Sequence, residues 1–329
     1  MMTVMNVLPP RISRLLNRLP RDMLPDLEEI RIREGRPLEI TVQGRFHYLD
    51  ADGQPTRSAD RAYRPDREDC RILMDLLTNH SVYTLEEELK RGYITVSGGH
   101  RVGLAGKTVL EQGRVKHLKE IASFNIRIAR EVRGAARELM PKLYDAEAGT
   151  IRHTLIVSPP QQGKTTLIRD IARALSTGDI AREDGAPSPP LKVGIVDERS
   201  EIAACIKGVP TFDVGPRTDV LDGCPKAEGM MMMIRAMSPD VIIVDEIGRP
   251  EDAEAIHEAL HAGIRIVATA HGQSFRDIAG RPMLRELVSE QIFQRYVVIG
   301  HTYGIGRVFR IYDRDGRMID AMIVRNAHA

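Results

Sequence analysis

Four short apolar runs alternate with segments of helical periodicity in the second part of the chain. The runs lie at residues 154–157, 192–196, 241–244 and 264–268. Such runs, without polar alternation, are typical of strands that are buried on both faces. Helices between such strands imply crossover connections and therefore a parallel sheet. The pattern predicts an α/β domain with a largely parallel sheet over residues 146–329.

The first part of the chain, residues 1–145, has a different pattern. Apolar spacing over 11–19 predicts an amphipathic helix, and alternation over 28–48 predicts a hairpin or meander. Glycines interrupt further short strands over residues 93–110 and 114–128. We expect a smaller α+β N-terminal domain here.

The end of the chain carries three more short apolar segments, at residues 297–299, 308–312 and 318–324. We expect these segments to extend the edge of the sheet as antiparallel strands.

Composition excludes several classes of protein. Lys and Arg number 47 and Asp and Glu 46, which argues against a strongly basic nucleic-acid binder. Three cysteines, Cys70, Cys205 and Cys224, fit neither a zinc pattern nor a disulfide framework, so a reducing compartment is expected. No apolar run reaches the length of a membrane span. The expectation is a cytoplasmic protein that can reach a membrane through partners.

The triplet Gly-Lys-Thr occurs twice, at residues 106–108 and 163–165. A phosphate-binding loop places it between a buried strand and a helix, after an earlier glycine. Both copies lack that glycine, because Arg101 and Ser158 occupy the position. The first copy runs into a turn at 112–113, whereas the second lies between a predicted strand and an apolar helical face. The second copy is therefore the predicted phosphate loop.

In such a loop, backbone N–H groups and the open helix N-terminus surround the β-phosphate. Lys164 would add a positive charge at the β- and γ-phosphates, and the Thr165 hydroxyl would bind Mg²⁺. ATP and Mg²⁺ are the expected cofactors. Ser158 and Gln161 stand where glycine is usual in such loops. Whether they slow the turnover of ATP is left open by the sequence. The predicted loop residues are Ser158, Pro159, Pro160, Gln161, Gln162, Gly163, Lys164, Thr165 and Thr166.

Polar residues follow three of the predicted strands. Asp245 and Glu246 end the run 241–244, where one carboxylate can serve Mg²⁺ and the other can orient or deprotonate water. His271 follows the run 264–268, where a polar group can contact the γ-phosphate. The acidic segment 197–201 can add carboxylates near the metal, and a solvated loop is the alternative.

These motifs, in this order, resemble the stage III sporulation protein AA family of spore-forming bacteria. The resemblance rests on VDERSEI, VIIVDEIG and TAHG after the phosphate loop and on LEEIRIREGRP and FNIRIARE in the first domain. That family is similar to the hexameric ATPases of type II and type IV secretion systems. The resemblance implies a RecA-like P-loop ATPase domain preceded by an α+β domain.

The resemblance also implies roles for individual residues. Glu198 falls in an acidic box, and His271 matches a histidine box. Arg217 and Arg235 lie where such motors place arginines that reach a nucleotide across a subunit boundary. The implied assembly is a homo-oligomer, a hexamer, with integral-membrane components of a sporulation channel complex as partners. The implied role is to energise a channel between mother cell and forespore.

Two other functions remain open on the sequence. RecA-like domains also drive nucleic-acid motors, and residues 114–142 are rich in Arg and Lys. The scarcity of aromatic residues argues against base stacking, so nucleic acid is the less favoured partner. The second alternative is a nucleotide-binding scaffold with weak turnover.

Overall fold

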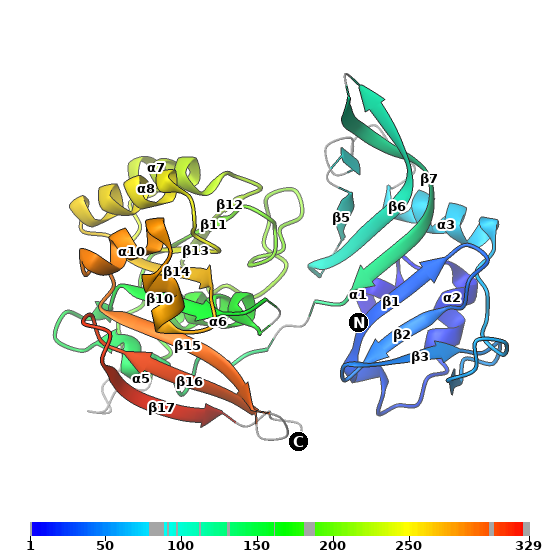
Figure 1. Cartoon of the computed structure of the whole chain (residues 1–329), viewed down its shortest axis with the longest axis horizontal. Coiled ribbons are helices and arrows are strands. Elements are labelled where there is room, and N and C mark those ends of the chain that lie inside the picture. The colour runs from blue at the N-terminus through cyan, green and yellow to red at the C-terminus, as the bar shows by residue number, and fades with distance from the viewer. Residues whose placement is uncertain are drawn as a thin grey trace. The chain divides into compact units, whose positions relative to one another are not determined.

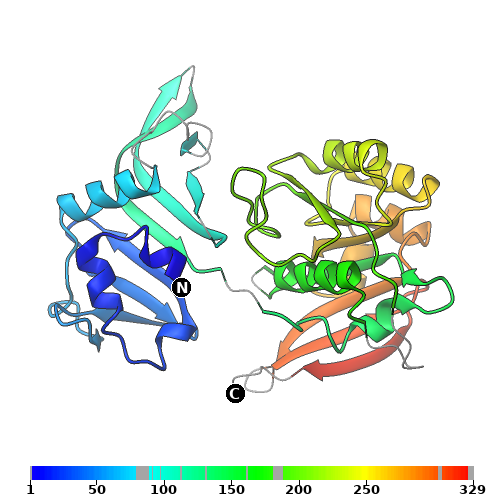
Figure 2. The ribbon, with the colours of Figure 1, turned by 180° about the vertical axis from the view of Figure 1, so that it is seen from behind.

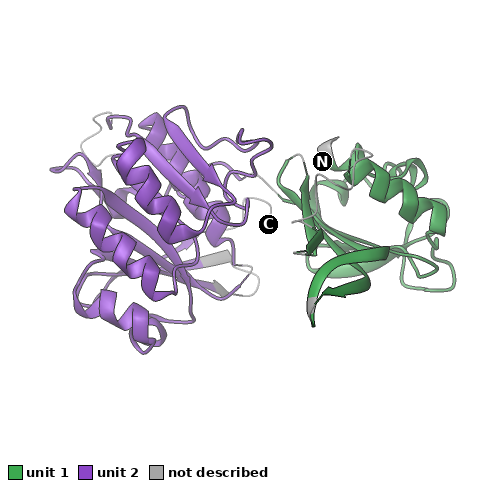
Figure 3. Cartoon of the chain, turned by 90° about the horizontal axis from the view of Figure 1, so that it is seen from above, with its two compact units in different colours: residues 1–130 green, residues 131–329 purple. Residues whose placement is uncertain are grey.

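The computed structural model describes residues 2–78, 89–90, 92–96, 98–111, 113–129, 132–160, 162–180, 188–302 and 306–324. The chain folds into two compact units, residues 1–130 and 131–329 (Figure 3). The units thus divide earlier than the predicted domains, which met at residue 145. Ala136, Leu139 and Leu143 explain the difference, because their side chains are buried in the core of the second unit.

Unit 1 is built on a seven-stranded antiparallel sheet with the strand order β4-β3-β2-β1-β7-β6-β5. Helix α3 starts with a capping box, in which Asp66 accepts from the Asp69 N–H and Asp69 accepts from the Asp66 N–H. The elements are α1 (Met2–Met5), α2 (Pro10–Leu16), the 3₁₀ turn η1 (Leu24–Asp26), β1 (Leu27–Arg33), β2 (Glu39–Val42), β3 (Arg45–Leu49), β4 (Pro55–Thr56), α3 (Arg67–Leu77), β5 (Tyr93–Val96), β6 (His100–Glu111) and β7 (Arg114–Arg127).

The core of unit 1 forms between one face of the sheet and the helices. Ile12 and Leu16 of α2 pack with Ile30, Ile40 and Phe124 of the sheet in one buried cluster. The alternation that predicted the first hairpin is therefore confirmed, because its apolar positions are those that face the helices. The predicted α+β character of this part follows directly.

Unit 2 is built on an eight-stranded sheet with the order β12-β11-β13-β14-β10-β15-β16-β17. A short pair, β8 and β9, precedes it. The strands are β8 (Tyr144–Asp145), β9 (Thr150–Ile151), β10 (Thr154–Ser158), β11 (Val193–Asp197), β12 (Thr218–Asp222), β13 (Val241–Val244), β14 (Arg265–His271), β15 (Arg295–Thr302), β16 (Gly306–Tyr312) and β17 (Met318–Val324). The helices are α5 (Met140–Leu143), α6 (Lys164–Thr177), α7 (Lys226–Ala236), α8 (Pro250–His261), α9 (Phe275–Ala279) and α10 (Pro282–Ser289).

Helices cover both faces of this sheet (Figures 1 and 2). Ile156 of β10 packs in one cluster with α5 and α6, and its neighbours Leu155 and Val157 pack in another with α7, α8 and α10. Successive side chains on a strand point to opposite faces, so an uninterrupted apolar strand needs a cover on each side. The predicted α/β fold with a largely parallel sheet is confirmed.

Two strands of this sheet differ from the sequence prediction. The segment at 297–299 belongs to β15, which pairs with β10 in parallel and not in the antiparallel sense that was predicted. The antiparallel pairs are β15 with β16 and β16 with β17. Strand β12 lies at the edge beside β11 and was not predicted. Its side chains are partly or fully exposed, so it carries no continuous apolar run.

In the described part of the chain, no helix combines the length and apolar character that crossing a bilayer would require.

Candidate active site

The predicted functional segments converge at one edge of the unit 2 sheet. Strands β11, β13, β14 and β10 are neighbours and run in parallel. Their carboxyl ends therefore meet at one edge, which is where open α/β sheets bind ligands. Each of these four ends carries one of the predicted motifs. The sheet thus assembles residues that lie far apart in the sequence.

Lys164 is the first residue of α6 and is almost completely buried. Its ammonium group donates to the backbone carbonyls of Ser158 (2.9 Å) and Pro159 (3.1 Å). It also lies 3.1 Å from Nδ1 of His271. Burial lowers the pKa of Lys164, and the charge of Glu246 opposes that shift. Among the described residues the hydrogen-bond acceptors of Lys164 are neutral groups, so this buried cation is well placed for an anion.

The loop before Lys164 turns through a left-handed residue. Gly163 has a φ of 81°, which glycine adopts without strain, and it precedes the first turn of α6. Thr165 and Thr166 follow in that turn and are half-buried. The Oε1 atom of Gln162 is buried without a hydrogen-bond partner among the described residues. Pro160 lies in the same loop, and Gln161 lies outside the described residues.

Glu246 is held by side chains from β14 and from the loop after β11. Its Oε1 lies 3.0 Å from Nε2 of His271 and its Oε2 lies 2.8 Å from a guanidinium nitrogen of Arg199. Its backbone N–H donates to the hydroxyl of Thr269 at 2.8 Å. Glu246 has a φ of 46°, an unusual conformation for a residue with a side chain. Both carboxylate oxygens thus have partners.

The contacts of His271 fix its tautomer. An ammonium group can only donate, so Lys164 makes Nδ1 the acceptor, and the proton then lies on Nε2 and faces Glu246. Lys164, His271, Glu246 and Arg199 form one continuous polar chain. Sequence reasoning placed three of these residues at the site and missed Arg199. Its only signal in the sequence was its position after a predicted strand.

Asp245 is almost completely buried beside this chain. Burial, together with the charge of Asp197, raises the pKa of Asp245 to about 7. Its Oδ1 is buried and has no hydrogen-bond partner among the described residues. Mg²⁺ in proteins usually keeps several of its coordinated water molecules, so one hydroxyl and one carboxylate are enough protein ligands for it. The orphaned oxygen of Asp245 and the hydroxyl of Thr165 are therefore a donor set that fits Mg²⁺.

The acidic segment after β11 is shaped by Asp197. Its carboxylate accepts backbone N–H groups from Glu201 (2.8 Å), Ile202 (2.9 Å) and Ala203 (2.9 Å). This closed loop presents Arg199 to Glu246. Glu198 instead forms an ion pair with Lys226 at the start of α7. The loop is thus not a freely solvated segment.

Two predicted site residues lie elsewhere. Arg217 is exposed before β12, and its guanidinium donates to the carbonyl of Pro190 at 2.8 Å. Arg235 is exposed in the last turn of α7. Within the described ranges, neither arginine forms a hydrogen bond or an ion pair with Lys164 or Glu246. Any role of theirs at this site requires a neighbouring subunit.

The other Gly-Lys-Thr copy has a different setting. Lys107 lies within β6 and is paired with Lys119 of β7. No helix follows in the described residues of this hairpin, so the copy lacks the helix N-terminus that a phosphate loop needs.

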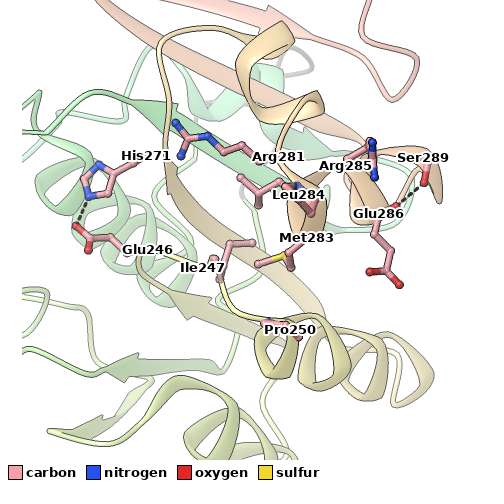
Figure 4. Close-up of a pocket in the computed structure, with 12 residues that line it drawn as sticks. Glu246, Ile247, Pro250, His271, Arg281, Met283, Leu284, Arg285, Glu286 and Ser289 are labelled. Atoms are coloured by element: carbon pink, nitrogen blue, oxygen red, sulfur yellow. Dashed lines mark hydrogen bonds and ion pairs between the residues drawn. The ribbon is translucent and has the colours of Figure 1, made fainter.

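A cavity of about 1000 Å³ opens beside Glu246 and His271. Figure 4 shows these two side chains at one end and Met283, Leu284 and Arg285 of α10 toward the other. Ile247, Pro250 and Pro282 add further apolar groups to its wall. The carboxyl edge of the sheet therefore continues into a largely hydrophobic recess.

The family model for sporulation stage III, protein AA, matches residues 2–319. The chain belongs to this family. The stage III sporulation protein AA of Bacillus subtilis strain 168 is 49% identical over 316 residues, which cover 96% of each chain. The predicted family resemblance is confirmed.

Solved structures also resemble this family member. The ATPase DotB of Legionella pneumophila has a TM-score of 0.55 at 16% identity, with 88% of this chain and 77% of that chain covered. The pilus retraction motor PilT with bound ADP has a TM-score of 0.55 at 16% identity, with 93% and 82% covered. These likenesses show that the chain shares the fold of these two proteins.

Proposed function

We propose that this family member is an ATPase that binds ATP with Mg²⁺ at residues 158–166 and hydrolyses it with Glu246 as the general base. One observation carries the proposal. Lys164, at the open N-terminus of α6, lies within 3.1 Å of His271, which in turn contacts Glu246. A phosphate-binding cation and a candidate base thus meet at the edge where parallel sheets bind ligands.

The contacts of Lys164 are compatible with exchange for a phosphate. Two of its acceptors are the carbonyls of Ser158 and Pro159, which are neutral. Charged phosphate oxygens make stronger hydrogen bonds to an ammonium group than carbonyls do. We therefore expect Lys164 to turn from these carbonyls and from His271 toward the β- and γ-phosphates.

Release of His271 changes its role. Its Nδ1 then loses the ammonium donor, and this nitrogen must carry a proton for the ring to donate to the γ-phosphate. Glu246 would accept the proton of the attacking water while Thr269 holds its backbone. Asp245 and Thr165 would hold Mg²⁺, which supplies positive charge at the β- and γ-phosphates.

The two Gly-Lys-Thr copies provide the test of the binding site. Lys164→Ala removes the buried cation and should weaken binding of a fluorescent ATP analogue at least about tenfold. Lys107→Ala is the matched control and should bind as the unaltered chain does. Equal weakening by both variants, or weakening by Lys107→Ala alone, would contradict the assignment.

We further propose a ring of identical subunits, a hexamer, that energises a sporulation channel and meets integral-membrane proteins of that complex. Arg217 and Arg235 are exposed on one subunit, which supports action on a neighbour's nucleotide, where an arginine stabilises transition-state charge. Glu198 would add a carboxylate near the Mg²⁺ that Asp245 and Thr165 hold.

Mixing two inactive variants tests action across the boundary. Lys164→Ala and Arg235→Ala together should regain hydrolysis, because some interfaces pair an intact loop with an intact arginine. Full activity of Arg235→Ala alone would exclude that arginine.

The proposed interaction with channel proteins has its own test. These proteins should co-purify with the intact chain.

A further inference from the structure

Strands β6 and β7 extend beyond the sheet of unit 1. β6 pairs with β5 over residues 100–103, and β7 pairs with β1 over residues 123–127. Farther out, in the described part of the chain, the two strands pair only with each other. We name residues 107–119 the distal ribbon; Gln112 within it lies outside the described residues. Figure 1 shows this hairpin rising past the other strands of its unit.

A built-in bend separates the distal ribbon from the sheet. The strand register shifts between Ala105 and Lys107. A Cβ at Gly106 would lie 2.7 Å from the carbonyl oxygens of both Lys119 and Glu120, so no larger residue fits there without movement. Glu120 has a φ of 49°. Bulges of this kind redirect a strand, and here the redirected part is the ribbon.

The tip of the distal ribbon exposes aliphatic side chains. Leu110 and Val115 face each other across the two strands. They are 61% and 44% exposed, among the largest values for apolar residues in unit 1. A two-stranded ribbon in water cannot bury such residues by itself and is only marginally stable. The tip therefore has exposed apolar surface that a lipid bilayer or another molecule could cover.

Basic residues of the ribbon lie directly opposite each other. Lys107 pairs with Lys119, and both are exposed. Like charges across a strand pair are destabilising. Among the described residues neither lysine has an ion pair, whereas Lys116 is paired with Glu111 at 2.7 Å. An anionic surface facing this pair would remove the repulsion.

We propose that the distal ribbon docks on an anionic lipid bilayer. Leu110 and Val115 would enter the boundary between headgroups and acyl chains, and Lys107 and Lys119 would lie at the lipid phosphates. The ribbon projects from its sheet and its tip is aliphatic, which suits a fluid interface more than a preformed groove. It carries no Phe, Tyr or Trp, so it lacks the stacking platform of nucleic-acid binders.

Vesicle flotation of the full chain tests the proposal. Vesicles of phosphatidylcholine with about a third phosphatidylglycerol should bind the chain, and pure phosphatidylcholine should not. Binding should fall steeply with added salt. The double variant Leu110→Ser/Val115→Ser and the charge reversal Lys107→Glu/Lys119→Glu should each weaken binding about tenfold or more.

Phe46→Ser is the matched control, because Phe46 of β3 is 58% exposed in the same unit. It should bind vesicles as the unaltered chain does, and circular dichroism melts should show that all variants fold. Absence of binding to the anionic vesicles, or binding that both ribbon variants retain, would overturn the proposal. Binding of duplex DNA without vesicle binding, abolished by the charge reversal, would make the ribbon a nucleic-acid element instead.

Discussion

Arg199 and Glu246 form an ion pair of 2.8 Å between the loop after β11 and the end of β13. The Asp197 carboxylate closes the loop that carries Arg199, so its backbone is held in place. Glu246 also contacts His271, so each of its carboxylate oxygens has one partner in the ligand-free chain. A water molecule that approaches Glu246 would therefore compete with Arg199 and His271 for this carboxylate.

Replacing Arg199 with Ala should therefore raise the basal rate of ATP hydrolysis, by roughly two- to tenfold if general-base action limits the rate. KM for ATP should change little, because Arg199 does not contact the phosphate loop in the described structure. Arg199→Lys keeps the charge and should behave as the unaltered chain does. A steady-state assay that instead shows a rate far below normal for Arg199→Ala would mean that Arg199 acts in the transition state.

Glu246→Gln keeps the shape of the side chain and removes the base. It should bind ATP and Mg²⁺ and hydrolyse ATP at least about a hundredfold more slowly, which is a typical cost of losing a general base. Binding and single-turnover measurements on one preparation separate the two effects. Hydrolysis near the normal rate would exclude Glu246 as the essential base.

Asp245→Asn should stabilise the ligand-free chain at pH 8. The pKa of Asp245 is raised to about 7 in the fold by burial, so above that pH the folded state carries a buried charge that water would solvate better. Stability is then lost as pH rises from the unfolded pKa through 7, and the amide removes this loss. We expect a gain of about 1–3 kcal/mol in the free energy of unfolding. Denaturant unfolding at pH 5 is the internal control, where the gain should shrink.

His100 predicts an acid sensitivity in unit 1. Burial lowers the pKa of His100 to about 4, and its Nδ1 accepts the backbone N–H of Ala129 at 3.0 Å. The folded state keeps the ring neutral while the unfolded chain protonates near pH 6.5. The contribution of His100 is thus full above pH 6.5 and is lost as pH falls toward 4, by up to roughly 3 kcal/mol.

His100→Gln retains an acceptor and cannot protonate in this range. Thermal melts of this variant should depend less on pH between 6.5 and 4 than those of the unaltered chain. His153 of unit 2, whose pKa burial likewise lowers to about 4, is unchanged in the variant. An unchanged pH dependence of the unit 1 transition would show that another group controls it.

The sequence by itself determined the order of the elements and the family. The run Thr154–Val157 before Gly163 and Lys164 fixes a buried strand followed by a helix, because an apolar run and a helical face are local properties. The same reasoning identified Lys164, and not Lys107, as the lysine of the predicted phosphate loop. It could not find β12, since an edge strand with exposed side chains has no apolar run to reveal it.

Only the tertiary structure decided which side chains meet. Arg199 follows β11, Glu246 follows β13 and His271 ends β14. Their contacts depend on the strand order β11-β13-β14-β10, which no local pattern contains. Residues 132–145 show the same limit at the boundary between the units. Their apolar spacing fits either unit. Leu139 and Leu143 are buried in the core of unit 2, which assigns this segment to that unit. The sequence alone could not show this, because burial depends on neighbours that are distant in the sequence.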